Sequence, residues 1–451
     1  MDVAEWLWSG VGAAFREGTL FAGTGFLVLG LSDLAVDLIW IALKLSRPTV
    51  PAPQPAVPAR IAVFVPAWDE AAVIGAMLRG ALAAFGHAAI RVYVGCYPND
   101  PATAAAVRAV ADPRIRLVTG GGPGPTTKAD CLNHLWEALL ADEAAGAERA
   151  DAVLLHDAED VVHPAALPLI AGLIGSFDLV QIPVLPLADP GSRWVAGVYI
   201  DEFVEAHSKE LVVRQALGAG LPAAGVGCAF SRAALAAIAG RNHGHPFDSA
   251  SLTEDYELGL RLAEAGGRSA FVRARDSAGS LIATREYFPA TLRAAVAQKS
   301  RWMCGIALAG WDRLGWRGGL AERWMRLRDR QAPLAALLLV AGYGALALWL
   351  ALEARQAATG QAPPALPHGL SLLLRANLAL LAWRLALRGA FVAHAYGGAE
   401  GLRSIPRIVV ANAIAMLAAR AALSRYRALR RTGRPRWDKT RHVFPAETAG
   451  A

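Results

Sequence analysis

Three carboxylates at positions 157–160 have the types and spacing of a metal-dependent group-transfer site. Asp157, Glu159 and Asp160 follow the apolar run 152–155, so they gather at the end of one predicted strand. Hard oxygen ligands of this kind suit Mg²⁺ or Mn²⁺, which would bridge two phosphates and neutralise charge on a departing diphosphate. An acidic surface loop is the alternative interpretation.

A second acidic group follows Thr253 at the start of a predicted helix. One poised carboxylate can take the proton from an attacking hydroxyl group, so Asp255 is the candidate general base and Glu254 is placed to orient it. In the alternative interpretation, Thr253 caps the helix and both acids stabilise its first turn. The two interpretations are compatible.

Cationic and aromatic side chains complete the set. Arg301 offers a planar fork suited to phosphate, and Trp302 offers a face on which a sugar ring can stack. Lys128 follows the glycine-rich stretch 120–124 and begins a predicted helix, where backbone amides and one ammonium group favour phosphate. The alternatives are an interfacial Arg-Trp anchor and a plain surface loop.

An α/β domain is predicted to position these groups. Short β-rich runs at 60–65, 90–95, 115–119, 152–156 and 179–182 alternate with helical patterns at 72–84, 102–110 and 129–141. This alternation is typical of a mostly parallel sheet, in which ligands bind beyond the carboxyl ends of the strands. Asp69 and Glu70 follow the first strand and are expected to meet the nucleotide's base or ribose, although Asp69 could instead cap the next helix.

The composition places this domain at a membrane. The 451 residues are 55% hydrophobic and 18% charged, with a mean hydropathy of +0.33, which predicts a soluble domain joined to spanning helices. The net charge of +7 is concentrated at 420–441, which favours a cytosolic tail near anionic lipid over a nucleic-acid partner. The widely spaced cysteines predict a reducing, cytosolic setting for the domain: Cys96, Cys131, Cys228 and Cys304.

Apolar segments predict the order of the membrane elements. The run 20–45 is long enough to span a bilayer, with a cleaved signal peptide as the alternative. Asp33 and Asp37 share one face of it and should meet protein or water. Further spans are expected at 332–352 and 372–394, whereas 405–422 better suits a membrane-surface helix because the basic tail should stay cytosolic. The predicted segments are 1–50 (first span), 51–59 (Pro-rich linker), 60–315 (catalytic domain), 316–331 (amphipathic interface helix), 332–425 (spanning and interfacial helices) and 426–451 (basic cytosolic tail).

In combination, the motifs resemble glycosyltransferase family 2. The resemblance rests on Gln298, Arg301 and Trp302 at QxxRW spacing, on Thr253-Glu254-Asp255, on the DxD-like stretch 156–160, and on 65–70 and 437–445. This inverting family contains cellulose and hyaluronan synthases. It implies a GT-A, Rossmann-like α/β domain inserted between transmembrane helices, with its active site on the cytosolic side of a bacterial inner membrane.

The resemblance also implies roles for particular residues. The family usually carries an Asp just after the second strand to contact uracil, but Cys96 and Tyr97 stand there and an acid returns only at Asp100. The segment 225–232 resembles the acceptor side. The implied donor-binding residues are Asp69, Glu70, Asp100, Lys128, Asp157, Gln298 and Arg301; the acceptor-binding residues are Trp302 and Phe230; the metal ligands are Asp157, Glu159 and Asp160.

The resulting functional prediction is a processive exopolysaccharide synthase that uses a nucleotide-diphospho-sugar, expected to be a UDP-sugar. Its partners would be a glycan or lipid-linked acceptor, membrane lipid and an export partner, with no nucleic acid. One alternative is a transferase that adds a single sugar to a lipid carrier. Another is a non-catalytic membrane scaffold or receptor, which the intact carboxylates Asp157, Glu159 and Asp255 disfavour.

Overall fold

The computed structural model describes residues 3–46, 59–86, 88–363, 365–433 and 443–445. Residues 51–58 of the predicted linker 51–59 and most of the tail 426–451 lie outside the described residues. The strands are β1 (Ile61–Pro66), β2 (Ile90–Cys96), β3 (Ile115–Thr119), β4 (Ala152–Leu155), β5 (Leu179–Gln181), β6 (Val184–Pro186), β7 (Cys228–Ser231), β8 (Ser269–Phe271) and β9 (Thr284–Glu286).

The helices divide between the catalytic domain and the membrane region. In the catalytic domain they are α2 (Ile74–Phe85), α3 (Pro101–Arg108), α4 (Lys128–Ala144), α5 (Ala166–Leu173), α6 (Ala196–Glu205), η1 (Ala206–Glu210), α7 (Leu211–Ala216), α8 (Arg232–Arg241), α9 (Glu254–Glu264), α10 (Leu292–Met303), η2 (Cys304–Ala309) and α11 (Gly310–Leu314). The others are α1 (Val3–Ser46), α12 (Leu320–Arg330), α13 (Ala332–Thr359), α14 (His368–Tyr396) and α15 (Gly398–Thr432).

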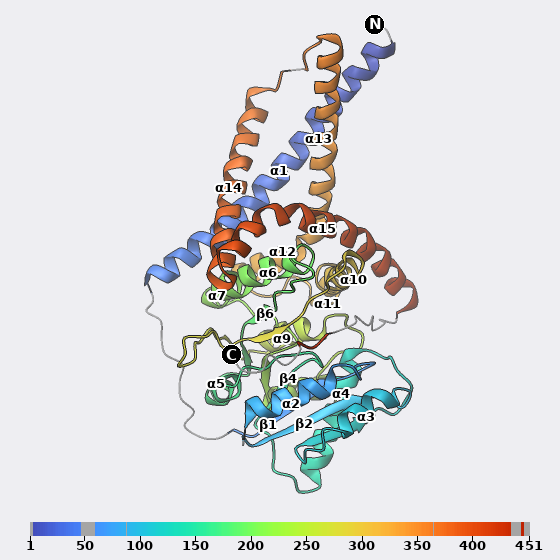
Figure 1. The fold of residues 1–451 in the computed structure, drawn as a ribbon, viewed down its shortest axis with the longest axis vertical. Helices are drawn as coiled ribbons and strands as arrows, with labels where there is room; N and C mark the ends of the chain where they lie inside the picture. The colour runs from blue at the N-terminus through green and yellow to red at the C-terminus, as the bar shows by residue number, and fades with distance from the viewer. Residues whose placement is uncertain (1–2, 47–58, 87, 364, 434–442, 446–451) are drawn as a thin grey trace.

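A seven-stranded sheet in the order β3-β2-β1-β4-β7-β5-β8 forms the centre of the catalytic domain. The five predicted strands appear as β1 to β5. The prediction of a mostly parallel sheet is confirmed, because only β7 runs antiparallel to its neighbours, β4 and β5. A separate parallel pair, β6 and β9, lies between this sheet and the helices above it (Figure 1).

Both faces of the sheet are buried. Successive side chains of β1 point to opposite faces and are all apolar, so each face needs a covering layer. Ile61, Val63 and Val65 pack with α2, α3 and α5. Phe64 faces the opposite side, where it packs with α4, α8 and α9. Because the sheet is covered on both faces, polar side chains that could bind a ligand are confined to the ends of its strands.

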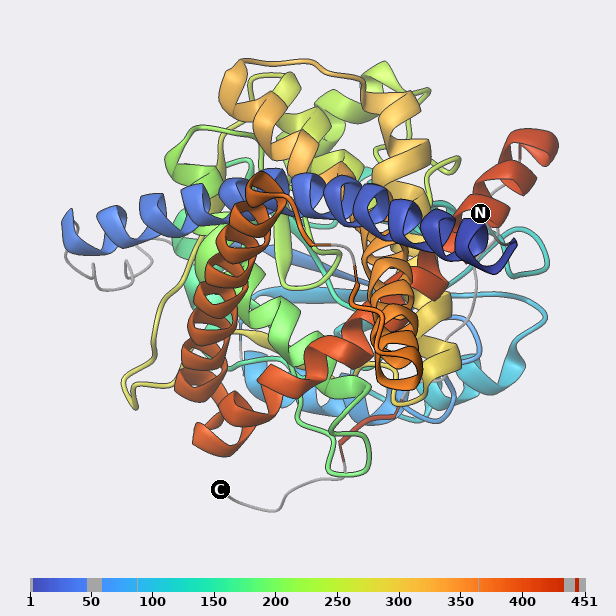
Figure 2. The same ribbon diagram turned by 90° about the horizontal axis from the view of Figure 1, so that it is seen from above.

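Helices α1, α13 and α14 rise together from the catalytic domain, with the amino terminus at the far end (Figure 1). Four helices among the described residues are long and apolar enough to cross a membrane, namely α1, α13, α14 and α15. The protein is therefore a membrane protein. Seen from above, α1 crosses both α13 and α14 (Figure 2).

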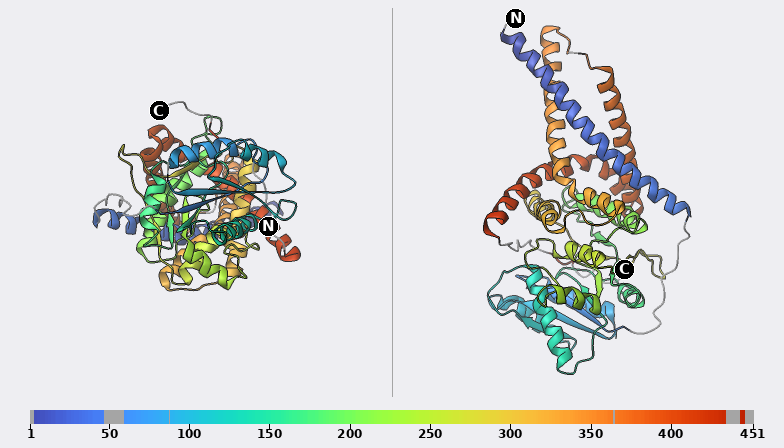
Figure 3. Two further views of the ribbon diagram at one scale, coloured as in Figure 1. Left: turned by 90° about the horizontal axis from the view of Figure 1, so that it is seen from below. Right: turned by 180° about the vertical axis from the view of Figure 1, so that it is seen from behind.

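Helix α15 lies across the base of the other three rather than alongside them, as the view from behind also shows (Figure 3). One of its faces packs on α10 and α6 of the catalytic domain. The buried guanidinium of Arg407 holds this contact through an ion pair with Asp201 of α6, at 2.8 Å, and it also pairs with Glu400 of its own helix, at 2.9 Å. Leu402, Val409 and Leu417 are exposed on the outer face. This arrangement is the one expected of a membrane-surface helix.

The predicted interface helix 316–331 corresponds to α12, but two of its arginines, Arg326 and Arg328, face the protein instead of the surface. Arg326 is 1% exposed and pairs with Glu322 and Glu264. Arg328 pairs with Asp33 of α1 at 2.9 Å. These arginines need buried carboxylates to satisfy their five donors, so α12 joins the catalytic domain to the bundle.

Candidate active site

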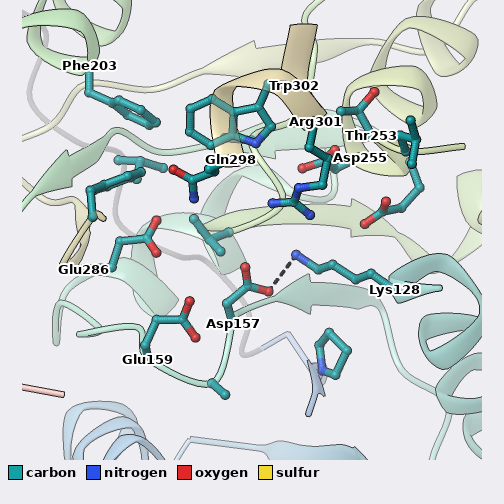
Figure 4. Close-up of a pocket in the computed structure, with 18 of the residues that line it drawn as sticks. Lys128, Asp157, Glu159, Phe203, Thr253, Asp255, Glu286, Gln298, Arg301 and Trp302 are labelled. Atoms are coloured by element: carbon teal, nitrogen blue, oxygen red, sulfur yellow. Dashed lines mark ion pairs between the residues drawn. The ribbon is translucent and has the colours of Figure 1, made fainter. Parts of the chain in front are cut away.

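One pocket collects side chains from several separate elements at the carboxyl side of the sheet (Figure 4). The end of β4, the start of α4, the start of α9, the strand β9 and the helix α10 each contribute to its wall. The charged and amide side chains that line it are Glu70, Lys128, Asp157, Glu159, Glu254, Asp255, Glu286, Gln298 and Arg301.

The carboxylate of Asp157 is bound by a cation of the protein itself. The Nζ atom of Lys128 lies 2.6 Å from Oδ1 of Asp157, and Lys128 is 14% exposed. Burial alone would lower the pKa of Lys128, but Asp157, Glu254 and Asp255 together raise it above its ordinary value. The lysine is therefore a fixed positive charge between two groups of acids.

Asp160 does not reach the pocket, which corrects its prediction as a metal ligand. Its Oδ2 atom lies 2.6 Å from Nδ1 of His156 and accepts a hydrogen bond from the backbone N–H of Asp157. Burial, with the nearby charges of Asp157 and Glu159, raises the pKa of Asp160 well above its ordinary range. Asp160 therefore shapes the loop that presents Asp157.

The remaining acids at this strand end can hold a divalent cation together with a ligand. No three His, Cys, Asp or Glu side chains within the described ranges are grouped so as to hold a metal ion. Asp157 and Glu159 both line the pocket. Mg²⁺ is usually bound by one or two carboxylates together with substrate phosphates and water. The carboxylates of Asp157 and Glu159 are therefore suited to bind such a cation.

Asp255 lies close to Lys128 on the other side of the pocket. Gly225, with φ of +78°, leaves room for it, because a Cβ atom there would collide with Oδ2 of Asp255 and lie 3.4 Å from Nζ of Lys128. Burial raises the pKa of Asp255, and Lys128 opposes that rise. Burial and the charge of Asp255 raise the pKa of Glu254 to about 7. Thr253 makes no side-chain cap to α9, so helix capping does not explain this motif.

Helix α10 presents Gln298, Arg301 and Trp302 to the pocket. The Trp302 ring packs against Tyr199, with centroids 6.0 Å apart, and against Phe203, at 6.1 Å. The side-chain oxygen of Gln298 is buried without a hydrogen-bond partner among the described residues. A buried amide oxygen of this kind is suited to accept a hydrogen bond from a hydroxyl group of a ligand.

The acids predicted to bind the donor nucleotide do not all reach the pocket. Glu70 lines the pocket, but Asp69 and Asp100 do not. Asp100 is buried and accepts hydrogen bonds from the backbone N–H groups of Asp69, at 2.6 Å, and Thr103, at 3.2 Å. Its prediction as a donor contact is therefore corrected: it caps α3 and holds Asp69, which has φ of +55°.

Phe230 is also corrected. It lies on β7 opposite Val153 and Leu179, and its ring is fully buried in the core under α4 and α8. The predicted acceptor-side segment 225–232 reaches the pocket through Val226 instead, next to Ala224, which also lines it.

Among the wall residues that sequence reasoning missed are Glu286, Phe203 and Phe288. Glu286 ends β9, which pairs with β6 and bridges to Val161 through Arg285. It is thereby held next to the loop that carries Asp157 and Glu159. The position of Glu286 just before α10 in the sequence could have indicated that it belongs to the site. However, a strand of three residues has no usable periodicity from which to predict its direction.

Comparison with known proteins agrees with this geometry. Residues 58–305 match the family model described as "Glycosyltransferase like family 2". The chain is 35% identical over 466 residues to bacteriophage adsorption protein B of Escherichia coli strain K12 and to bacteriophage N4 adsorption protein B of E. coli O157:H7, covering 93% of this chain and 61% of each relative. The chain thus spans about three fifths of the length of these relatives.

A solved structure shares the fold. It is a mannosyltransferase from Pyrobaculum calidifontis in complex with GDP-mannose and Mn²⁺, with a TM-score of 0.52 and 18% identity, covering 88% of this chain and 99% of the other. The prediction of a GT-A domain with flanking apolar helices is confirmed.

Proposed function

Because this chain belongs to glycosyltransferase family 2, we propose that it transfers a sugar, with inversion, from a nucleotide-diphospho-sugar to a hydroxyl group of a glycan or lipid-linked acceptor. The observation that carries the proposal is the convergence of Asp255, Lys128, Asp157, Arg301 and Trp302 on one pocket. A buried carboxylate, two cations and an aromatic ring are the groups that this reaction needs.

The reaction follows from these positions. The acceptor oxygen attacks the anomeric carbon while Asp255 takes the hydroxyl proton, and the bond from that carbon to the diphosphate oxygen breaks. Lys128 and Arg301 stabilise the negative charge that develops on the departing nucleoside diphosphate. Mg²⁺ or Mn²⁺ held by Asp157 and Glu159 would supply further neutralisation of the same charge.

The pocket has a phosphate end and a sugar end. Lys128 and Arg301 provide the cations of the phosphate end, whereas Glu286 lies on the side of Asp157 away from Lys128 in Figure 4. Near Glu286 are Gln298 and the aromatic wall around Trp302. Carboxylate and amide groups bind hydroxyls, and aromatic faces stack on sugar rings, so we assign the transferred sugar and the acceptor to this end.

A growing glycan is the favoured acceptor. Trp302 lies in the same apolar cluster as Val410 and Ile414 of the membrane-surface helix α15, so an acceptor stacked on Trp302 would lie close to the bilayer. The proposal places the catalytic domain on the cytosolic side of a bacterial inner membrane, with elongation linked to export. The names of the E. coli relatives suit a glycan that reaches the cell surface, where a bacteriophage could adsorb.

The test uses the full chain in nanodiscs with a panel of UDP- and GDP-sugars. Released nucleoside diphosphate and product length are measured, with Asp255→Asn as the control. Release that depends on an acceptor and on Asp255 supports the proposal. Long products indicate processive elongation, and single additions indicate transfer to a lipid carrier. No release from any donor would contradict the assignment.

A further inference from the structure

Lys128 lies where the proposed reaction needs two positive charges. One is the ammonium group that binds the diphosphate, and the other is a divalent cation bound by Asp157. The ammonium group of Lys128 is bound to Asp157, which lines the pocket, at 2.6 Å. On its other side it faces the acids that begin α9, Glu254 and Asp255, both of which act on it electrostatically. In Figure 4 the lysine side chain extends across the pocket floor and ends at Asp157.

The lysine is held in this position by the fold. Thr127 caps α4 by accepting a hydrogen bond from the backbone N–H of Asp130, so the first helical residue, Lys128, leaves the helix start in a fixed direction. The loop at Gly225 closes over it from the opposite side. A side chain that is 14% exposed cannot swing freely into solvent without losing its carboxylate partner.

This pairing has a consequence for metal binding. A divalent cation at Asp157 has to displace the ammonium group or share the same carboxylate with it at short range, where like charges repel strongly in a partly buried site. A nucleoside diphosphate removes the conflict because its phosphates offer Lys128 a new anionic partner. Asp157 then becomes available to the cation.

We infer that Lys128 makes metal binding conditional on the donor: it serves as the counter-ion of Asp157 before the nucleotide arrives and transfers to the diphosphate when metal and nucleotide enter together. The inference rests on the proposed function, since it takes Asp157 to be a ligand of the donor's cation. It makes Lys128 a positioning residue for metal entry as well as a phosphate contact. The device would keep Asp157 and Asp255 from holding a cation unproductively between turnovers.

A lysine that only binds phosphate behaves differently. Removing such a lysine would weaken nucleotide binding and leave the metal affinity of the nucleotide-free protein unchanged. Removing a counter-ion of Asp157 should instead strengthen nucleotide-free metal binding, because an acidic pocket has lost its internal cation. The sign of the change in metal affinity separates the two roles.

The experiment is a Mn²⁺ titration followed by electron paramagnetic resonance, on the full chain in nanodiscs, with and without UDP or GDP. In the wild type we expect Mn²⁺ to bind at least about tenfold more tightly with nucleotide, a typical coupling between two sites. In Lys128→Met we expect nucleotide-free Mn²⁺ binding to tighten by about tenfold and the dependence on nucleotide to fall. Lys128→Arg, which keeps the cation, should behave like the wild type.

Lys299→Met is the matched control. Lys299 is also 14% exposed and pairs with a carboxylate, Glu202, that does not line the pocket, so its loss should leave nucleotide-free Mn²⁺ affinity unchanged. If Lys128→Met does not fold, Lys128→Gln provides the same measurement. Unchanged or weaker nucleotide-free Mn²⁺ binding after loss of Lys128 would overturn the inference.

The proposed sugar transfer and the proposed role of Lys128 in metal binding can be contradicted independently of each other. Mn²⁺ affinity is read directly and needs no turnover, so donor-dependent release of nucleoside diphosphate without the predicted coupling would remove the role of Lys128 alone. Nucleotide-coupled Mn²⁺ binding without sugar transfer from any donor would leave Lys128's role in place and contradict the proposed reaction.

Discussion

Lys209 of the catalytic domain donates a hydrogen bond to Asp37 of the first membrane helix at 2.6 Å, joining residues 172 positions apart. The pair is buried, with exposed side-chain fractions of 6% and 4%. Trp383 of α14 donates to the other oxygen of Asp37 at 2.9 Å. One carboxylate therefore ties the membrane bundle to the domain that holds the active site.

Loss of the cation from this pair should destabilise the protein. Lys209→Met leaves buried Asp37 without its charged partner, and breaking a buried pair in this way typically costs about 3–5 kcal/mol. Unfolding of the detergent-solubilised protein measures the change. Lys44→Met, at an exposed lysine of α1, is the control and should have little effect. Equal losses in the two variants would contradict a specific role for the Asp37–Lys209 pair.

A second prediction concerns the general base. Asp255→Asn keeps the shape of the side chain and removes its ability to accept a proton, so transfer should fall by at least about 10²–10⁴-fold. Donor binding, measured by calorimetry with a nucleoside diphosphate, should change little because Lys128, Arg301 and Asp157 remain. Wild-type turnover in this variant would exclude Asp255 as the base.

The same site predicts an acid limb in the pH profile. Burial raises the pKa of both Asp255 and Glu254, the latter to about 7. The base works only when deprotonated, so kcat/KM should begin to fall at a higher pH than an ordinary carboxylate would give. Lys128 lowers both pKa values, so Lys128→Met should move this limb to higher pH. A profile that is flat from about pH 8 to about pH 5, where ordinary carboxylates remain ionised, would contradict the prediction.

The sequence was sufficient to predict that Lys128, Asp157, Asp255 and Arg301 lie near one another, because ligands bind beyond the carboxyl ends of the strands in such a sheet. Lys128, Asp157, Asp255 and Arg301 come from four different elements and still share one pocket. Their common feature is a position at an element end, which hydrophobic patterning locates well.

The errors concern the direction in which a side chain points. Phe230 lies in a strand buried on both faces, so the sequence pattern could not indicate which face its ring takes. Asp160 turns inward because His156, one helical turn away in sequence, offers a buried nitrogen. Asp100 accepts hydrogen bonds from the backbone N–H groups of Thr103 and Asp69, so its side chain caps α3 and does not reach the pocket. Each outcome depends on a partner that only the folded chain provides.

The metal prediction can be tested with two neighbouring acids. Glu159→Ala should weaken Mn²⁺ binding in the presence of a nucleoside diphosphate, because Glu159 lines the pocket with Asp157. Asp160→Asn should largely keep that affinity, since its carboxylate faces His156, and should instead lower the melting temperature. Full transfer activity in excess chelator, or equal loss of metal affinity in both variants, would contradict this division of roles.

The last prediction concerns the side of the membrane on which each end lies. At about 1.5 Å per residue, α1 is about 66 Å long, well beyond the roughly 30 Å of a hydrocarbon core. The carboxyl end of α13 meets the start of α1, where the Arg355 guanidinium lies 5.1 Å from the Trp8 ring. This end carries few positive charges, whereas the end of α15 is rich in arginine, so we predict from the charge bias that α15 and the catalytic domain lie in the cytosol.

Single cysteines at Ala358 and Ala428 test this topology, because both positions are exposed and the four native cysteines are buried. In intact cells a membrane-impermeant maleimide should label Ala358→Cys from the periplasm and leave Ala428→Cys unlabelled. Permeabilised cells, in which both should react, provide the control. The reverse pattern in intact cells would place the catalytic domain outside the cytosol, away from the nucleotide-sugars on which the proposed reaction depends, and would overturn the route from Trp302 into the bilayer.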